Sequence, residues 1–415
     1  MVLGKIASSH LPRLGSIYVH WPFCKKICPY CDFNKYASVN VDHTRMRRCL
    51  VLETETLLKK LSVSQIQSIY FGGGTPSIAE PLTLEAVIDK ASSKLPFCKN
   101  VEVSLEVNPT TTEIRHLKDF KVAGINRVSV GVQALKDCDL KVLGREHTVR
   151  DVLRCIEEAK EVFGDNVSID LMFGRPGQLL NDWSSELDHL SSLACKHVSL
   201  YQLTMKRHTP MGRLYKQGKL ALPSDDELAA MYDVAVDRLE SSGLLRYEIS
   251  NFAVKGFESN HNKTYWSGGD YIGVGPGAHG RFSMMKDGTF RRCSSMQLPL
   301  PENWMNEVER QRHGTVKSHL LTAQEVYEEL ILSGLRMTSG IERETFEENT
   351  HVRFDQLRTK ESIVALVDEG LLLLDETSMR ASHKGLSLVD SIISEVCLAV
   401  EDINMSTDNI KRDNG

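Results

Sequence analysis

The sequence has no apolar run long enough to cross a bilayer, so no transmembrane segment is predicted. It also lacks a strong excess of charge of either sign. Its 50 Lys and Arg against 55 Asp and Glu give a formal net charge of −5, which gives no electrostatic reason to expect nucleic acid as a partner. With 41% hydrophobic residues in 415, the chain can hold one large α/β domain and a smaller one.

Regular cysteine spacing is absent from most of the chain. Seven of the 10 cysteines are dispersed: Cys49, Cys98, Cys138, Cys155, Cys195, Cys293 and Cys397. This usage is typical of a reducing compartment and argues against a disulfide framework. The other three cysteines stand close together, at Cys24, Cys28 and Cys31.

These three cysteines directly follow an apolar run, 17–21, that is predicted to be a strand. A cubane iron–sulfur cluster has four irons, and each takes one thiolate. Three thiolates therefore hold three irons and leave the fourth open to a small molecule, so we predict a [4Fe-4S] cluster on Cys24, Cys28 and Cys31. A structural zinc site is the alternative, because His20 could complete a Cys3His ligand set.

The first half of the chain alternates strand-like apolar runs with amphipathic stretches. This alternation favours a parallel sheet of βα units, and six units predict a partial (β/α)6 barrel. The predicted strands are 17–21, 68–71, 101–107, 127–132, 167–173 and 197–203. The predicted helices are 41–61, 83–95, 112–123, 149–163 and 180–194.

Polar residues gather at the carboxyl ends of these strands, where α/β barrels place their chemistry. The cysteine loop follows the first strand, and Asp170 lies in the fifth. The other strand ends carry Gly72–Ser77, Glu106–Pro109, Gly131–Gln133 and Tyr201–Gln202. Together they predict one active site that holds a cluster and an organic ligand.

The second half of the chain does not continue this alternation of strands and helices. Residues 205–300 are predicted to be rich in loops, interrupted by a helical pattern over 224–239. The glycine-dense run 268–280 does not open a helix, so it is not a dinucleotide fingerprint. Helical patterns over 323–335, 343–346, 356–369 and 382–400, with an apolar run at 371–374, predict a small, mainly helical, winged-helix-like module. The predicted domains are an N-terminal segment over 1–15, the barrel and its extension over 16–300, the module over 301–400, and a disordered tail over 401–415.

The N-terminal segment has two serines, and no acidic residue precedes Asp32. This faintly resembles the end of an organelle transit peptide.

Taken together, the cysteine loop and the rim residues resemble the radical S-adenosylmethionine (radical SAM) proteins. More narrowly, residues 16–395 resemble the group that contains HemN, the oxygen-independent coproporphyrinogen III oxidase, HemW, the heme chaperone, and their mitochondrial homologues. The resemblance implies a [4Fe-4S] cluster whose open iron is chelated by S-adenosylmethionine. The cofactor contacts that it implies are Tyr18, Tyr30, Gly73, Gly74, Thr75, Glu106, Gln133, Arg145 and Asp170.

Elementary chemistry is consistent with these assignments. Glycines let backbone N–H groups approach a ligand carboxylate closely, and the Arg145 guanidinium suits a carboxylate. Glu106 and Asp170 are carboxylates in apolar strands and need partners there. Those partners are either ligand groups, such as ribose hydroxyls, or a basic residue.

Two features separate the chain from HemN-type decarboxylases. Those enzymes carry a further cysteine two residues after the third cluster ligand, where this chain has Phe33, and they carry an N-terminal extension, whereas here 23 residues precede Cys24. HemW has a loop much like this one, and it also has the H-N-x-x-Y-W run found here at 261–266. The resemblance implies that His261, Tyr265 and Trp266 handle heme, because a histidine offers an axial nitrogen and the aromatics offer flat apolar surface.

We therefore expect a HemW-type chaperone that binds heme and passes it to an apo-hemoprotein, with an electron donor for the cluster. No catalytic residue is assigned, and coproporphyrinogen III oxidase activity is not expected. The alternative is a radical SAM enzyme that acts on a porphyrinogen, within porphyrin metabolism. The resemblance predicts a mitochondrial location in a eukaryote and a cytoplasmic one otherwise.

Overall fold

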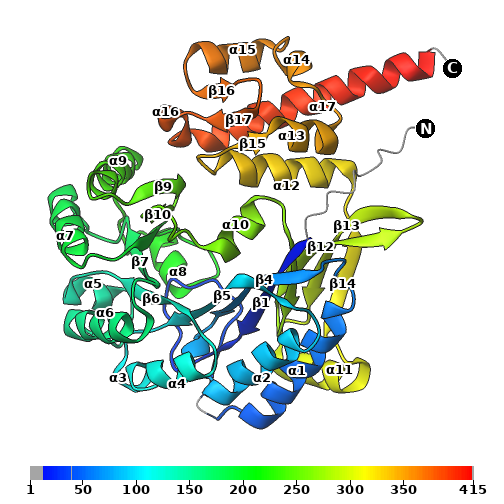
Figure 1. Ribbon diagram of the computed structural model, residues 1–415. Helices are drawn as coiled ribbons and strands as arrows, with labels where there is room; N and C mark the ends of the chain where they lie inside the picture. The colour runs from blue at the N-terminus through cyan, green and yellow to red at the C-terminus, as the bar shows by residue number, and fades with distance from the viewer. Residues whose placement is uncertain (1–12, 39, 414–415) are drawn as a thin grey trace.

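The computed structural model describes residues 13–38 and 40–413. Six parallel strands form its centre (Figure 1): β1 (Leu14–Trp21), β4 (Gln65–Gly73), β5 (Phe97–Val107), β6 (Arg127–Gln133), β7 (Val167–Phe173) and β8 (His197–Gln202). All six predicted strands are present, and the predicted partial (β/α)6 barrel is confirmed. Their apolar side chains are buried on both faces of the sheet, as expected for a parallel sheet covered by helices.

Helices cover the outside of this sheet. They are α1 (His43–Leu58), α2 (Pro81–Ser92), α3 (Thr111–Ile114), α4 (Leu117–Val122), α5 (Asp137–Val142), α6 (Val149–Phe163), α7 (Leu180–Ser192) and α9 (Asp225–Ser241). The helix α8 (Pro210–Lys216) instead lies against the cysteine loop, where the Met211 N–H donates to the Pro29 carbonyl at 2.9 Å. The single helix predicted over 112–123 is divided into α3 and α4, because His116 departs from helical geometry between them. The short segments β2 (Phe23–Cys24), β3 (Tyr36–Ala37) and η1 (Pro76–Ile78) lie in the loops at the carboxyl ends of the strands.

The sheet extends beyond the predicted barrel on both edges. On one edge lie β10 (Asn251–Ala253) and β9 (Leu245–Glu248), and on the other lie β11 (Asp270–Val274), β12 (His279–Lys286), β13 (Thr289–Gln297) and β14 (Thr315–Leu320). β11 pairs parallel to β1, and β12 to β14 continue as antiparallel strands. The segment predicted to be rich in loops over 205–300 therefore also contains the strands β9 to β13, and α9 matches the helix predicted over 224–239. The helix α10 (Asn260–Trp266) packs against β1 and β4.

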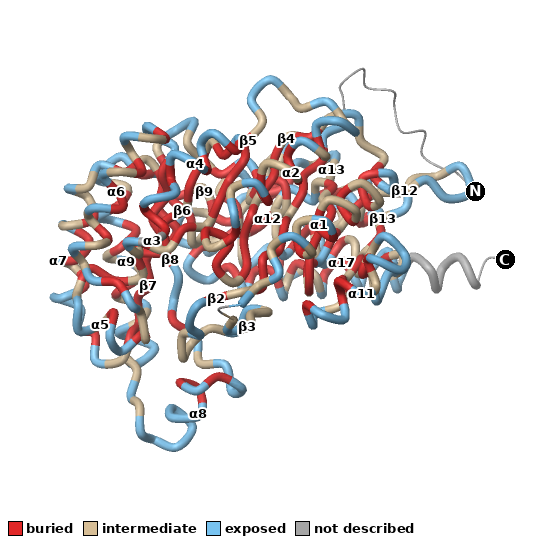
Figure 2. Tube along the Cα trace, turned by 90° about the horizontal axis from the view of Figure 1, so that it is seen from below, coloured by how far each residue is buried: buried red, intermediate tan, exposed pale blue. Residues whose placement is uncertain are grey.

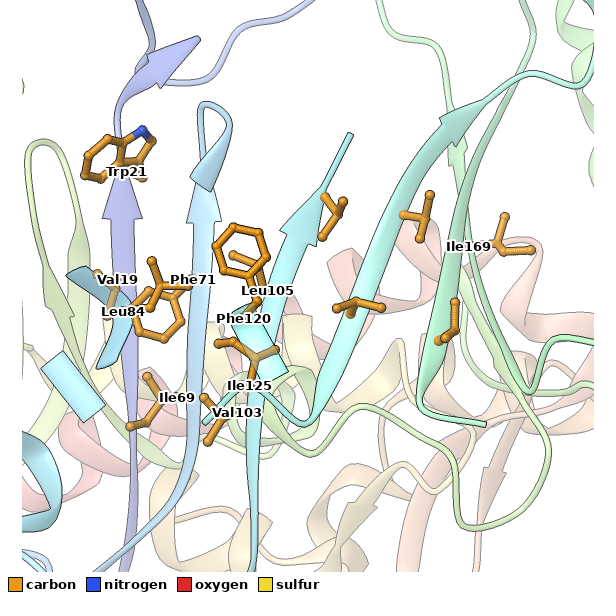
Figure 3. Packing of buried hydrophobic residues seen from close by; sticks show 14 of the residues in the cluster. Val19, Trp21, Ile69, Phe71, Leu84, Val103, Leu105, Phe120, Ile125 and Ile169 are labelled. Carbon is orange, nitrogen blue, oxygen red and sulfur yellow. The ribbon is translucent and has the colours of Figure 1, made fainter. Parts of the chain in front are cut away.

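The barrel core lies between the sheet and the outer helices. Side chains from neighbouring strands form rows, as Val19, Ile69, Phe71 and Leu105 do in Figure 3, and Leu84 of α2 packs over them. In Figure 2 the buried residues lie along the strands, whereas the helices are buried along one side only. This amphipathic arrangement accounts for the helical periodicity of the sequence.

A second core forms the C-terminal module, which is drawn in orange and red above the barrel in Figure 1. Its elements are α12 (Ala323–Leu335), β15 (Ile341–Glu342), α13 (Arg343–Thr350), α14 (Phe354–Leu357), α15 (Glu361–Asp368), β16 (Leu372–Leu374), β17 (Ser378–Ala381), α16 (His383–Leu386) and α17 (Val389–Asp413). Three short strands with helices fit the predicted winged-helix-like module. The module joins the barrel where Arg336 pairs with Glu248 of β9 at 3.2 Å.

Two boundaries of this module differ from the prediction. The helix α11 (Pro301–Gln311) and β14 belong to the barrel, since Trp304 and Val308 are buried in the first core. The predicted disordered tail over 401–415 is instead helical through Asp413, because Ile403 is buried against the second core and Asp402 pairs with Lys360. No helix in the described part of the chain has the length and apolar character needed to cross a membrane. Of the predicted N-terminal segment, residues 1–12 lie outside the described residues.

Candidate functional site

A cavity of about 380 Å³ lies at the carboxyl ends of the parallel strands. It is lined by all three loop cysteines and by most of the predicted cofactor contacts: Cys24, Cys28, Cys31, Tyr30, Gly73, Gly74, Thr75, Glu106, Gln133, Arg145 and Asp170. Of the predicted cofactor contacts, only Tyr18 does not line it. The convergence of strand ends inferred from the sequence is therefore present in the structure.

The cysteine loop is held by short-range contacts beyond the end of β1. β2 pairs with β3 on either side of the loop, and the backbone N–H of Cys31 donates to the carbonyl of Cys28 at 3.2 Å. All three cysteines are free thiols, and burial raises the pKa of Cys24 and of Cys31. The Arg145 Nη1 atom lies 3.6 Å from Cys28 Sγ, so the guanidinium lies beside the cysteine loop.

His20 does not complete a zinc site in this structure. Its Nε2 is 2.7 Å from the Asn34 carbonyl oxygen, and its Nδ1 is 3.0 Å from the Tyr18 hydroxyl. Both ring nitrogens are therefore occupied. Among the described side chains, no three His, Cys, Asp or Glu residues converge as they would on a single metal ion. A cubane, in contrast, takes each thiolate at a separate iron.

The glycine run has a different role from the predicted one. The N–H groups of Gly74 and Thr75 donate to carbonyls at Trp21 and Phe23, and that of Gly73 donates to the carboxylate of Glu106 at 3.1 Å. These N–H groups are thus used within the protein and do not point at a ligand carboxylate. Glycine is required for space, because a Cβ on Gly73, whose φ is +113°, would lie 2.5 Å from the His20 ring.

Two carboxylates face the cavity from different strands. Glu106 Oε1 accepts a hydrogen bond from Tyr70 at 3.0 Å, and Asp170 Oδ1 accepts one from Ser129 at 3.0 Å. Burial, and then the charge of Asp170, raise the pKa of Glu106 to about 7, while burial raises the pKa of Asp170 to about 6. Neither carboxylate forms an ion pair with a described residue, so the basic partner allowed by the sequence is not found.

Arg145 and Gln133 complete the wall opposite the glycine run. Arg145 Nη2 donates to Asn108 Oδ1 at 2.6 Å and to the Gly131 carbonyl at 3.1 Å, so the guanidinium is fixed at the cavity edge. Gln133 has a φ of +67°, which is rare for a residue with a side chain. Such backbone strain persists where the surrounding structure imposes it, often at a binding site.

Tyr18 and the α10 helix lie behind this cavity. Tyr18 stacks on Tyr70 with ring centroids 6.2 Å apart, and Tyr70 in turn stacks on His261 at 4.9 Å. Burial, and then the charge of Glu106, raise the pKa of Tyr18 well above its usual range. The Tyr18 ring therefore lies behind Tyr70, which lines the cavity.

The predicted heme residues do not share one surface. His261 is 1% exposed, its Nδ1 lies 2.8 Å from the Ser68 hydroxyl, and its Nε2 contacts the Tyr265 hydroxyl. With both nitrogens occupied, His261 cannot act as an axial ligand in this structure. Trp266 packs on Tyr247. Tyr265 alone of the three lines a cavity, the larger one between the barrel and the C-terminal module.

Sequence reasoning did not single out Tyr70 and Ser129, which hold the two carboxylates. One signal was available for Tyr70: it lies two residues before Gly72 in the same strand and therefore faces the same side of the sheet. Ser129 has the same relation to Gly131 in β6. Neither tyrosine nor serine is unusual in a strand, so residue type alone did not indicate that these side chains belong to the site.

The residues of this cavity fit the groups that the resemblance implies. Three free thiols on one loop match a cluster with an open iron. Two carboxylates without a basic partner suit the positive charges and ribose hydroxyls of S-adenosylmethionine, and the Arg145 guanidinium suits its carboxylate.

Comparison with known proteins agrees with this fold and site. A family model described as the Radical SAM superfamily matches residues 18–190, and one described as the HemN C-terminal domain matches residues 321–388. The structure of coproporphyrinogen III oxidase (HemN) from Escherichia coli superposes with a TM-score of 0.75 at 20% identity, and the match covers 95% of this chain and 91% of that one. The fold and the cysteine site therefore define a radical SAM protein, a class that implies a [4Fe-4S] cluster and S-adenosylmethionine.

Individual relatives identify the family of this chain within the radical SAM superfamily. The chain is 42% identical to radical S-adenosyl methionine domain-containing protein 1, mitochondrial, from Danio rerio, over 96% of this chain and 91% of that protein. It is 34% identical to heme chaperone HemW from Bacillus subtilis, over 91% of this chain and 98% of that protein. The chain belongs to the family that contains these two proteins.

Proposed function

We propose that this protein is a heme chaperone of the HemW type, which binds a [4Fe-4S] cluster, S-adenosylmethionine and heme and delivers heme to apo-hemoproteins. The observation that carries the proposal is Phe33. This residue stands where HemN-type decarboxylases have a further cysteine, and its side chain is 61% exposed at the mouth of the cysteine cavity. The name of the Bacillus subtilis relative supports the same function.

In this proposal the chain's own residues fix the cofactor pocket. Cys24, Cys28 and Cys31 hold the cluster, which supplies one-electron chemistry when bound. Arg145 binds the carboxylate of S-adenosylmethionine. Glu106 and Asp170 accept hydrogen bonds from its polar groups.

The location follows from the relatives. The Danio rerio relative and those from Bos taurus and Mus musculus carry the word mitochondrial in their names. For a chain from a eukaryote we propose the mitochondrion, where an electron donor must reduce the cluster and an apo-hemoprotein must receive heme.

Heme transfer tests this proposal directly. The reconstituted protein is loaded with heme, freed of excess heme, and mixed with an apo-hemoprotein whose absorbance changes when it is filled. We expect the acceptor spectrum to appear faster than with the same amount of heme bound to albumin. If the acceptor fills no faster than from albumin, the protein is not a chaperone.

The second candidate is a radical SAM enzyme acting on a porphyrinogen. The fold shared with HemN and the complete cofactor cavity favour it. In that case the chain would cleave S-adenosylmethionine only when its substrate is present.

A further inference from the structure

A second cavity in the described part of the chain lies away from the cysteine loop. It measures about 790 Å³ and lies between the β12–β13 hairpin of the barrel and the helices α12 and α13 of the C-terminal module. Figure 1 shows the module resting on the barrel through α12. Small-molecule sites typically enclose about 300–1,000 Å³, so this space is large enough for a macrocycle.

Its two walls are suited to a flat apolar molecule. On the barrel side Tyr265 and Tyr271 meet edge to face with ring centroids 4.2 Å apart. Phe290 of the hairpin also lines the cavity, and the Arg13 guanidinium lies over its ring at 4.1 Å. On the module side Val326 and Leu330 of α12 present aliphatic surface. A planar ring placed between these walls would be covered on both faces.

Three arginines line this cavity on the side of the β12–β13 hairpin. Arg281 pairs with Glu329 at 2.7 Å, and Arg292 pairs with the buried Asp270 at 3.3 Å. Arg291 also lines the cavity, is exposed, and has no ion-pair partner among the described residues. It is therefore free to bind a carboxylate of a ligand.

A histidine stands at the opposite side. His351 ends α13 in a left-handed conformation with a φ of 58°, and it lines the cavity. Its imidazole is exposed and has no hydrogen-bond partner among the described residues. This is the reverse of His261, whose two nitrogens are both occupied. A neutral imidazole with a free nitrogen is an effective ligand for heme iron.

We propose that this interdomain cavity is the heme site: the macrocycle lies between the aromatic and aliphatic walls, a propionate binds Arg291, and His351 ligates the iron. This inference rests on the proposed function. It also places the cargo in a different cavity from the cluster, so that heme and S-adenosylmethionine bind without displacing one another.

Heme titration of four variants tests the site. Arg291→Glu should weaken heme binding at least tenfold, and His351→Ala should weaken it and shift the Soret band. Arg115→Glu and His116→Ala are the matched controls, because both residues are exposed on the far side of the barrel, and they should bind heme like the wild type. Cluster absorbance should be the same in all four, which shows that each variant is folded.

The outcomes separate the inference from the function. If the wild type binds heme while Arg291→Glu and His351→Ala bind it with unchanged affinity and spectrum, the site is elsewhere and the chaperone proposal stands. If the wild type binds no heme, both fail. Heme dimethyl ester, which lacks free propionates, should bind more weakly than heme to the wild type, and equal binding would overturn the role of Arg291.

Discussion

At the scale of single residues, the cofactor cavity depends on carboxylates that are costly to enclose. Glu106 and Asp170 have hydroxyl and backbone donors but no cation, and their raised pKa values reflect the cost of burying charge. Perturbed groups of this kind in a cavity are typical of functional sites. Their arrangement is better explained by a ligand than by stability of the fold.

Truncating Asp170 should weaken the cofactor site without unfolding the protein. The loss of a hydrogen bond to a charged group costs roughly 1.5–3 kcal/mol, which is about tenfold to a hundredfold in affinity. Calorimetry on Asp170→Ala should show this loss for S-adenosylmethionine, whereas the exposed Asp165→Ala should match the wild type. Wild-type affinity in both Asp170→Ala and Glu106→Ala would remove these residues from the site.

The same carboxylates predict a pH dependence. Glu106 has a pKa of about 7 and Asp170 one of about 6 in the free protein, so both become protonated as the pH falls through that range. Protons therefore compete with the cationic ligand, and affinity for S-adenosylmethionine should fall between pH 8 and pH 5. Glu106→Gln should flatten the upper part of this curve. Constant affinity across the range would show that the ligand does not contact the ionised groups.

The sequence predicted which residues meet at this site but not all of their roles. Strand-end position placed Glu106 and Asp170 correctly, because parallel strands end at one edge. A heme role for the H-N-x-x-Y-W run stays a prediction, and sequence could not show that both nitrogens of His261 are occupied. The glycines were predicted as a ligand cradle, and in the structure crowding against His20 explains why position 73 is a glycine.

At the scale of elements, one buried side chain of α1 connects three segments at the edge of the sheet formed by β11 to β14. Glu53 accepts hydrogen bonds from the N–H of Gly275 after β11, from Trp304 Nε1 of α11, and from the N–H of Gly314 before β14. Burial raises the pKa of Glu53 to about 7. Three donors on three segments depend on this one carboxyl group.

Glu53→Ala should therefore destabilise the barrel strongly. Each buried donor left without a partner costs roughly 1–3 kcal/mol, so a loss of at least about 3 kcal/mol is expected from chemical denaturation. The matched control is Glu55→Ala on the same helix, whose ion pairs with Lys94 and Arg312 lie at the surface and contribute little to stability. Equal small losses in the two variants would contradict this role for Glu53.

The parallel strands were predictable from sequence because they are near-continuous apolar runs, as in 167–173. The strands β11 to β14 were not, since the glycines of 268–280 and the polar residues of 289–297 are typical of loops. Pairing with β1 and with each other decides their conformation. Such long-range pairing is not encoded in local pattern.

At the scale of the whole molecule, the barrel and the C-terminal module have separate hydrophobic cores, and the two cavities described above lie in different places. The barrel core carries the cysteine cavity at its strand ends, and the contact between barrel and C-terminal module creates the larger cavity. The sequence predicted a small helical module but not where it docks. Docking depends on contacts such as Arg336 with Glu248, which join residues far apart in the chain.

The central claim is that this radical SAM protein carries heme and does not make a porphyrin. The most direct measurement is a paired assay on one anaerobic, reduced preparation with its cluster intact: heme titration, and decarboxylation of coproporphyrinogen III in the presence of S-adenosylmethionine. The account predicts stoichiometric heme binding with a defined Soret band and no protoporphyrinogen. Protoporphyrinogen formed over many turnovers would contradict it and identify the protein as an enzyme.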